Sequence, residues 1–290
     1  MRQDRHFLPM SLEAYLKARP MLKDARWVQG LEARKRDEAT FHDYIRSSEA
    51  IAQCPDSQRN LKFYKITQLS KAYVRHWLYT HVNGKVFLDY ACGDGRHSES
   101  ILQHAEPQWL VGLDISPESV QLCAQKARAL PHSERAYFFQ GDCEHTEFPD
   151  NTFDVILCSE MLHHLDLSAA FRELYRISAP GGEILCCEAL GINPCIQWYR
   201  RRTPDLRTEF EAHHILTPQS LRLAEQVGFS IHEVRYWHLF AIPAAFFTER
   251  PMLFRCLLAC GNALDAIVLK IPYIQRLAWQ FTFVLKKDAP

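Results

Sequence analysis

The chain has 290 residues, of which 47% are hydrophobic, and it carries 34 basic and 34 acidic residues. This length suits one large α/β domain with additions, or two small domains, and the apolar content is sufficient for a core. Because the charges balance, no strong positive field is available to draw the chain onto nucleic acid, and we expect no nucleic-acid partner.

The ten cysteines follow neither a zinc nor a disulfide pattern, and no CxxC motif occurs. Most of them lie inside apolar runs, as small buried side chains do in a reducing compartment. The N-terminus lacks the apolar core of a signal peptide, and we find no uncharged apolar stretch of about 18 residues. We therefore expect a cytoplasmic protein without a membrane span, and no His, Cys or Glu spacing suggests a metal.

The residue pattern of the first part of the chain, residues 1–82, predicts a helical N-terminal cap. It contains a polar stretch at 32–38 and a mixed segment at 62–81, and it shows no alternation of strands and helices. Asn83-Gly84 then breaks the pattern, and residues 83–290 form the predicted main domain.

Short apolar runs alternate with helical segments from residue 85 onward. This pattern predicts an α/β fold, with a mostly parallel, doubly wound, Rossmann-like sheet that is covered on both faces. Ligands in such sheets bind beyond the carboxyl ends of the strands. The expected strands span residues 86–90, 109–113, 136–140, 153–159, 183–190, 229–237 and 280–285.

Two inserts interrupt this pattern, at residues 191–214 and 239–276. The second is strongly apolar, and its polar residues Arg255, Asn262 and Asp265 lie on one narrow helical stripe. A helix of this composition is expected to bury most of its girth. Packing on the sheet, a homodimer contact and a hydrophobic lid over a substrate pocket are the alternatives, with a role at a membrane surface less favoured.

The segment from Leu88 to Gly95 ends one expected strand and opens a helix. Gly93 and Gly95 allow a tight turn whose backbone approaches a ligand closely. The helix that follows offers unpaired N–H groups and a partial positive charge, which suit a carboxylate or a phosphate.

Three acids narrow the ligand that this turn predicts. Asp89 lies at the end of the first strand, inside the turn motif. Asp114 ends the second strand, where a carboxylate can accept hydrogen bonds from both hydroxyls of an adenosine ribose. Asp142 follows the third strand and can accept from the adenine amine. The ligand implied has an adenosine and a polar end held over the turn.

At this point the chain resembles the class I S-adenosylmethionine-dependent methyltransferases of the small-molecule, type 11 kind. The resemblance rests on residues 89–95, 112–116 and 141–142, on the stretch 153–165, and on 280–285, which looks like the family's antiparallel seventh strand. It implies a seven-stranded sheet and S-adenosylmethionine as the cofactor. A nicotinamide cofactor is the alternative, but its GxGxxG motif would place a third glycine where this chain has Ser98.

The resemblance also implies contacts to the cofactor, although Ala91 stands where the family usually has its first glycine. Tyr64 and His42 are candidates from the N-terminal helices to close over the cofactor. The implied contacts are Asp89, Ala91 and Gly93 around the methionine portion, Asp114 and Ile115 at the ribose and adenine, Asp142 and Cys143 at the adenine amine, and Ser159 on the sulfonium side.

A general base is needed only if the acceptor atom starts protonated. Candidates are His164, after the fourth strand, and His213 and His214 in the first insert, whereas His163 is expected to shape the pocket. Trp198, Tyr199 and Arg207 are candidates to bind the substrate.

The expected reaction is methyl transfer to a small, apolar metabolite of the polyketide, terpenoid, quinone or modified-peptide class. A cofactor-binding or partner-binding protein without catalysis is the alternative.

Overall fold

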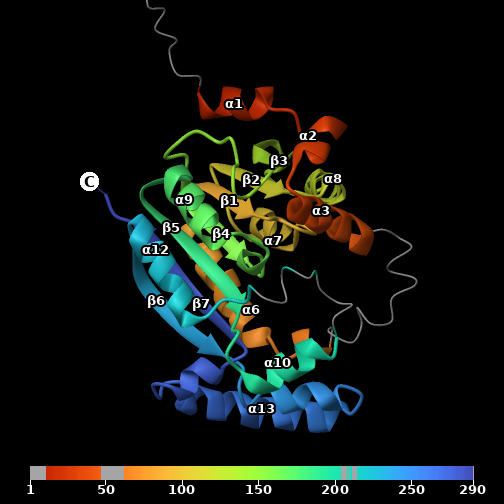
Figure 1. Ribbon diagram of the computed structural model, residues 1–290, viewed down its shortest axis with the longest axis vertical. Coiled ribbons are helices and arrows are strands. Elements are labelled where there is room, and N and C mark those ends of the chain that lie inside the picture. The colour runs from red at the N-terminus through yellow and green to blue at the C-terminus, as the bar shows by residue number, and fades with distance from the viewer. Residues whose placement is uncertain (1–10, 47–61, 204–207, 209, 211–213, 290) are drawn as a thin grey trace, which may run out of the picture.

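The protein is an α/β structure built on one seven-stranded sheet (Figure 1), seen here in a computed structural model that describes residues 11–46, 62–203, 208, 210 and 214–289. The strand order is β3-β2-β1-β4-β5-β7-β6, and β7 runs antiparallel to both of its neighbours. The expected Rossmann-like fold is therefore confirmed. The strands are β1 (Val86–Tyr90), β2 (Trp109–Asp114), β3 (Ala136–Gln140), β4 (Phe153–Ser159), β5 (Ser178–Ala189), β6 (Phe229–Trp237) and β7 (Gln280–Lys287).

Helices cover both faces of the sheet. Those of the N-terminal part are α1 (Leu12–Ala18), α2 (Ala25–Gly30), α3 (Ala33–Arg46) and α6 (Gln68–His81). Those that follow are α7 (Arg96–His104), α8 (Pro117–Ala127), α9 (Leu167–Ile177), α10 (Pro194–Arg201), α12 (Leu221–Val227) and α13 (Pro251–Val268). The division of the chain at residue 82 into a cap and a main domain stays a prediction.

Two hydrophobic clusters hold these layers together. On one face, α6, α7 and α8 bury side chains such as Leu78, Ile101 and Val120 against the sheet. On the other face, α9 and α12 bury Phe171 and Leu221. Because β1 is buried at all five positions, it reads in the sequence as an apolar run interrupted only by Asp89, as a central parallel strand should.

Local capping explains where two crossover helices begin. The Ser116 hydroxyl accepts a hydrogen bond from the backbone N–H of Ser119 at 3.0 Å, and Pro117 occupies the first helical position of α8. Asp166 caps α9 in the same way, through the N–H of Ala169. Both helices begin just beyond the carboxyl edge of the sheet, so their N-termini border the region where ligands bind.

One expected strand start is wrong. β5 begins at Ser178 rather than at residue 183, because Ser178 already pairs with Phe153 ahead of an irregularity in the ladder with β4. The turn glycines Gly181 and Gly182 are therefore part of the strand as the structure defines it.

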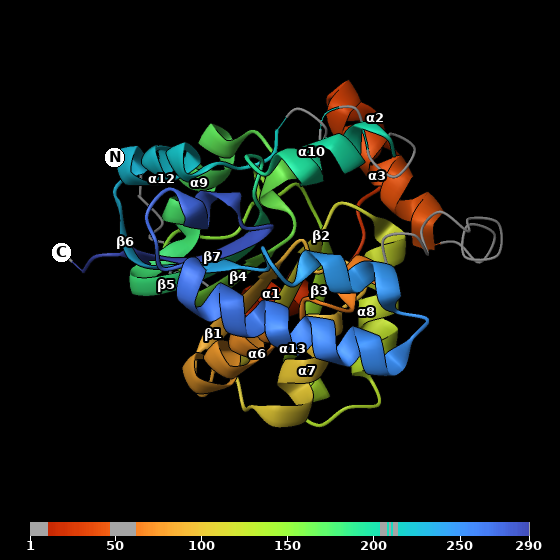
Figure 2. The same cartoon turned by 90° about the horizontal axis from the view of Figure 1, so that it is seen from below.

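The apolar insert 239–276 departs most from expectation. α13 lies at one end of the molecule, away from α1 at the other, and Figure 2 shows it running across the face seen from below. Only 17% of the residues of α13 are buried, so the prediction that this helix buries most of its girth is wrong. By length and composition α13 also qualifies as a membrane-crossing helix, contrary to the expectation that the chain has no such segment.

Candidate functional site

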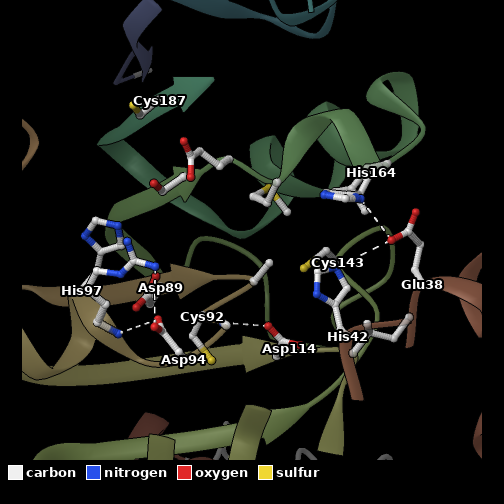
Figure 3. A pocket seen from close by; sticks show the side chains of 18 of the residues that line it. Glu38, His42, Asp89, Cys92, Asp94, His97, Asp114, Cys143, His164 and Cys187 are labelled. Atoms are coloured by element: carbon white, nitrogen blue, oxygen red, sulfur yellow. Dashed lines mark hydrogen bonds and ion pairs between the residues drawn. The ribbon is translucent and has the colours of Figure 1, made fainter. Parts of the chain in front are cut away.

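A cavity of about 270 Å³ lies at the carboxyl ends of the central strands. Its walls come from the turn after β1, from the residues that end or follow β2, β3 and β4, and from the helices α3 and α6. Figure 3 shows Asp89, Asp94 and His97 on one side of this pocket and Glu38, His42 and His164 on the other, with Asp114 between them.

The turn after β1 has left-handed backbone at three alternate residues, with φ values of 60° at Ala91, 55° at Gly93 and 75° at Gly95. Ala91 adopts this conformation although it is not a glycine, so alanine is tolerated at this position. At Gly95 a side chain would clash, because an added Cβ would lie 2.8 Å from Sγ of Cys123. The turn thus brings the backbone close to whatever occupies the cavity.

Asp114 fixes this turn from the end of β2. Its Oδ2 accepts a hydrogen bond from the N–H of Gly93 at 2.8 Å, and its Oδ1 accepts from the N–H of Ser116 at 3.0 Å. A carboxylate has about four acceptor positions, so both oxygens retain acceptor capacity toward the cavity. That geometry suits the two hydroxyls of a ribose.

Asp89 is buried beneath the turn and bonded to the start of α7. Its Oδ2 accepts from the hydroxyl of Ser98 at 2.7 Å and from the Ser98 N–H at 3.2 Å. Burial raises the pKa of Asp89 to about 7, although the bonds from Ser98 act in the opposite direction. The group therefore changes charge near neutral pH.

Asp142 is engaged by the N-terminal helix α3. Its Oδ2 lies 2.7 Å from Nζ of Lys35, which also lies 2.9 Å from a carboxylate oxygen of Glu144. The Asp142 Oδ1 accepts from the N–H of Glu144 at 2.8 Å. An adenine amine at Asp142 would share the carboxylate with Lys35, so α3 forms one wall of that part of the cavity.

These residues fit S-adenosylmethionine. The left-handed turn offers close backbone, Asp114 offers acceptors for the ribose, and Asp89 and Glu160 place carboxylates that complement the sulfonium and ammonium charges. The individual contacts remain predictions.

A carboxylate and two histidines meet on the α3 side of the cavity. Oε2 of Glu38 lies 3.0 Å from Nδ1 of His164 and 3.7 Å from Nε2 of His42, and Oε1 accepts from the Thr208 hydroxyl at 2.5 Å. Burial raises the pKa of Glu38, but the hydrogen bonds from His164 and Thr208 outweigh it and the net shift is downward. Glu38 therefore stays ionised beside His164.

The same three groups could also ligate a metal, since one ligand atom from each lies within 4.8 Å of the others. A zinc ion with bonds of about 2.1 Å requires its ligand atoms within about 4.2 Å of one another. Oε2 of Glu38 and Nδ1 of His164 already form an ion pair at 3.0 Å, and we interpret the cluster as an acid–histidine group.

A second series of polar side-chain contacts runs from the cavity to the start of the apolar insert at residue 239. Gln280 donates to Oε1 of Glu160 at 2.9 Å and accepts from the Ser70 hydroxyl at 2.9 Å, and Nε2 of His238 lies 3.0 Å from that hydroxyl. Glu160 follows β4 with φ of 54°. Burial, followed by the charge of Glu188, raises the pKa of Glu160 to about 7.

These carboxyls predict that S-adenosylmethionine binds more tightly as the pH rises. Asp89 and Glu160 both line the cavity with pKa values near 7, so at pH 6 each is mostly protonated. A bound cation favours their ionised forms, and binding must then release protons. We expect the dissociation constant to fall from pH 6 to pH 8 by about tenfold for each carboxyl that must ionise.

Titration calorimetry in buffers of different ionisation enthalpy measures both the affinity and the proton release. The Asp89→Asn variant should retain a flatter pH dependence, since one titrating group is gone. An affinity that is constant from pH 6 to pH 8, with no proton release, would contradict the prediction.

Most of the expected site residues lie together. The residues from the sequence analysis that line the cavity are Asp89, Ala91, Gly93, Asp114, Ile115, Asp142, Cys143, Ser159, His42 and His164. His163 is buried beside them and lies 2.7 Å from Glu188 through Nδ1.

Four other predicted site residues do not line the cavity. Tyr64 packs against Trp279, with ring centroids 6.2 Å apart, and Tyr199 packs against Phe63 at 4.9 Å. Trp198 is 58% exposed and carries Arg202 over its ring. His214 is exposed and stacks on Phe210, so the prediction that it faces the acceptor pocket is wrong. These side chains pack against other parts of the protein and do not line the cavity.

Two further candidates, Arg207 and His213, lie outside the described residues. The insert 239–276 supplies no wall of the cavity, so its predicted role as a lid that forms the acceptor pocket is wrong.

Some residues that line the cavity were not predicted from the sequence. Glu160 and Gln280 lie at the carboxyl edge, directly after β4 and at the start of β7, and the topology could have indicated both. Lys35 and Glu38 had no such signal, because they belong to a polar helix whose docking face the sequence does not show.

Comparisons with known proteins agree with this site. A family model described as a methyltransferase domain matches residues 88–186. Demethylmenaquinone methyltransferase of Lactiplantibacillus plantarum is 30% identical over 153 residues, which cover 48% of this chain and 64% of that protein. Phthiotriol/phenolphthiotriol dimycocerosates methyltransferase 1 of Mycobacterium ulcerans is 32% identical over 126 residues, which cover 42% of this chain and 45% of that protein.

The chain thus spans less than two thirds of the length of these relatives. Among solved structures, geranyl diphosphate C-methyltransferase of Streptomyces coelicolor has the same fold, with a TM-score of 0.58, 14% identity, and coverage of 89% of this chain and 99% of that one. Residues 88–186 are thus similar to a methyltransferase domain, and the cavity lies at the carboxyl ends of the strands within that stretch.

Proposed function

We propose that this protein transfers a methyl group from S-adenosylmethionine to a small, largely apolar acceptor, with His164 as the general base. The observation that carries the proposal is the single cavity in which Asp89, Asp114 and Asp142 lie together with the His164–Glu38 pair. A cofactor-binding protein without catalysis would not need the second group.

The bound cofactor supplies an electrophilic methyl group on a sulfonium. The chain must then hold the acceptor in line with that methyl group and exclude water. Val74, Met161, Leu165 and Cys187 line the cavity and offer apolar surface to an acceptor. We take a hydroxylated quinone-type metabolite as the first acceptor class to test, because one relative is named for demethylmenaquinone.

The geometry gives His164 the means to take a proton. Glu38 holds Nδ1 of His164 at 3.0 Å and stays ionised, so the ring is oriented and the positive charge that follows protonation at the other nitrogen is stabilised. Arg34 donates to the backbone carbonyl of His164 at 2.9 Å and fixes the loop that carries it.

The cellular compartment that we propose is the reducing cytoplasm. The cysteines that the structure describes are all free thiols, and most are buried. This pattern supports a setting in which disulfides do not form.

The test is transfer of radiolabelled methyl from S-adenosylmethionine by the full chain. A reduced naphthoquinone serves as the apolar acceptor and phosphoethanolamine as a polar control. We expect label in the apolar product and none in the control. Tight cofactor binding without transfer to the apolar acceptor would overturn the proposed acceptor class; transfer to phosphoethanolamine alone would do the same.

A further inference from the structure

The helix α13 reverses the usual pattern of a surface helix, because its side toward the protein is polar and its outer side is largely apolar. Its side toward the protein carries Gly261, Asn262 and Asp265, and Gly261 and Asp265 are buried. Its outer side is apolar apart from Arg255, and exposed apolar residues continue into the segments on either side. The exposed apolar side chains of this α13 surface include Phe246, Met252, Leu253, Leu264, Ile267 and Tyr273.

The exposure is extensive for a face without a partner. Met252 is 74% exposed, Ile267 68% and Tyr273 77%. Contiguous apolar patches of this kind mark interaction sites on soluble proteins. The question is therefore what covers the α13 surface.

The polar inner side fixes α13 flat against the domain. The Asp265 carboxylate accepts hydrogen bonds from the N–H groups of Leu239, Phe240 and Ala241, the shortest at 2.8 Å. At Gly261 the helix lies so close to this segment that an added Cβ would be 2.5 Å from the carbonyl oxygen of Phe240. A membrane-crossing helix would have to break these contacts, whereas a helix lying along a surface keeps them.

Exposed cations outnumber exposed acids in α13 and the segments beside it. Residues 239–279 include the exposed Arg250, Arg255, Lys270 and Arg276, against one exposed acid, Glu249. Apolar side chains with a basic rim are complementary to the headgroup region of a bilayer that contains anionic lipids. Tyr273, beside Arg276 at 5.3 Å, has the amphipathic ring that favours this interface.

A second copy of the chain fits this surface less well. In a two-fold pair the same patch meets itself, and antiparallel α13 helices would bring Arg250 and Arg255 of one copy toward Lys270 of the other. Like charges would then border an apolar contact, which opposes pairing.

We propose that the α13 surface docks on an anionic lipid bilayer, with α13 parallel to the membrane plane. This role goes beyond the proposed methyl transfer and does not depend on it. The docked face adjoins the cavity through a small apolar cluster in which Phe63 and Ile66 pack against Ala241, Ala244 and Ala245. The helix α6 begins just after Ile66 and carries Ser70 and Lys71 into the cavity wall, so the active site lies one layer from the bilayer.

Sedimentation of the full chain with vesicles tests the proposal. We expect binding to vesicles of phosphatidylcholine with phosphatidylglycerol, and weaker binding in high salt. The Met252→Glu/Ile267→Glu double variant should weaken this binding by at least about tenfold, because two apolar anchors are lost. Arg255→Gln and Lys270→Gln should each weaken it by about fivefold.

Met21→Glu is the matched control, since Met21 is a half-exposed apolar residue that lies between α1 and α2 at the other end of the molecule. It should leave vesicle binding unchanged, and thermal unfolding should show that all variants are folded. Absence of binding to anionic vesicles would overturn the proposal, as would equal binding by the double variant. A dimer in solution that the double variant dissociates would instead assign the surface to a second copy.

Discussion

Replacing Asp114 with asparagine should weaken S-adenosylmethionine binding by at least about tenfold, since a hydrogen bond to a charged group contributes roughly 1.5–3 kcal/mol. Asparagine keeps the shape of the side chain but loses the charge and one acceptor oxygen. It also disturbs the bond from the N–H of Gly93, which holds the turn. Titration calorimetry measures the effect, and Asp114→Ala should lose more.

A matched control distinguishes a binding role from a general effect of charge. Asp166 caps α9 outside the cavity, and Asp166→Asn retains a good capping residue. We expect this variant to bind the cofactor as the wild type does. If Asp114→Asn binds equally well, the assignment of the ribose site is wrong.

The second large effect concerns His164. If it is the general base, His164→Ala should lower turnover by roughly 10²–10⁴-fold while cofactor affinity changes little. The acid limb of the pH–rate profile, which the base sets, should disappear in this variant. Glu38→Gln should retain more activity, because it removes the orienting charge but leaves the imidazole in place.

His214→Ala is the control for this experiment, since His214 is exposed and lies outside the cavity wall. It should keep the turnover and the pH profile of the wild type. A His164→Ala enzyme with an unaltered acid limb would show that no proton passes through His164, and alignment alone would then account for catalysis.

The parts of the structure that the sequence predicted are those whose signals are local. A buried parallel strand is a continuous apolar run, and the turn after β1 needs Gly93 and Gly95 for its own backbone conformation. Asp114 ends β2 and Asp142 follows β3 after Gly141, so the topology rule brings them to one edge. The cofactor half of the cavity follows from these facts.

The acceptor half depends on contacts between distant segments. Glu38 reaches His164 only because α3 packs over the carboxyl edge, and nothing in the polar stretch 32–38 indicates that docking. The same limit explains the wrong reading of α13. Its composition shows how much apolar surface it has, but only the bonds to Asp265 show that this end of the polar stripe faces inward, while Arg255 is exposed.

The sheet register at the insert has an evolutionary consequence. Trp237 at the end of β6 pairs with Gln280 at the start of β7, so the insert leaves and rejoins the sheet at paired positions, like the loop of one long hairpin. The entropy of closing such a loop grows only slowly with its length. Descendants of this chain can therefore lengthen, shorten or exchange the segment without moving a strand, and the surface it presents can diverge faster than the cofactor pocket beside it.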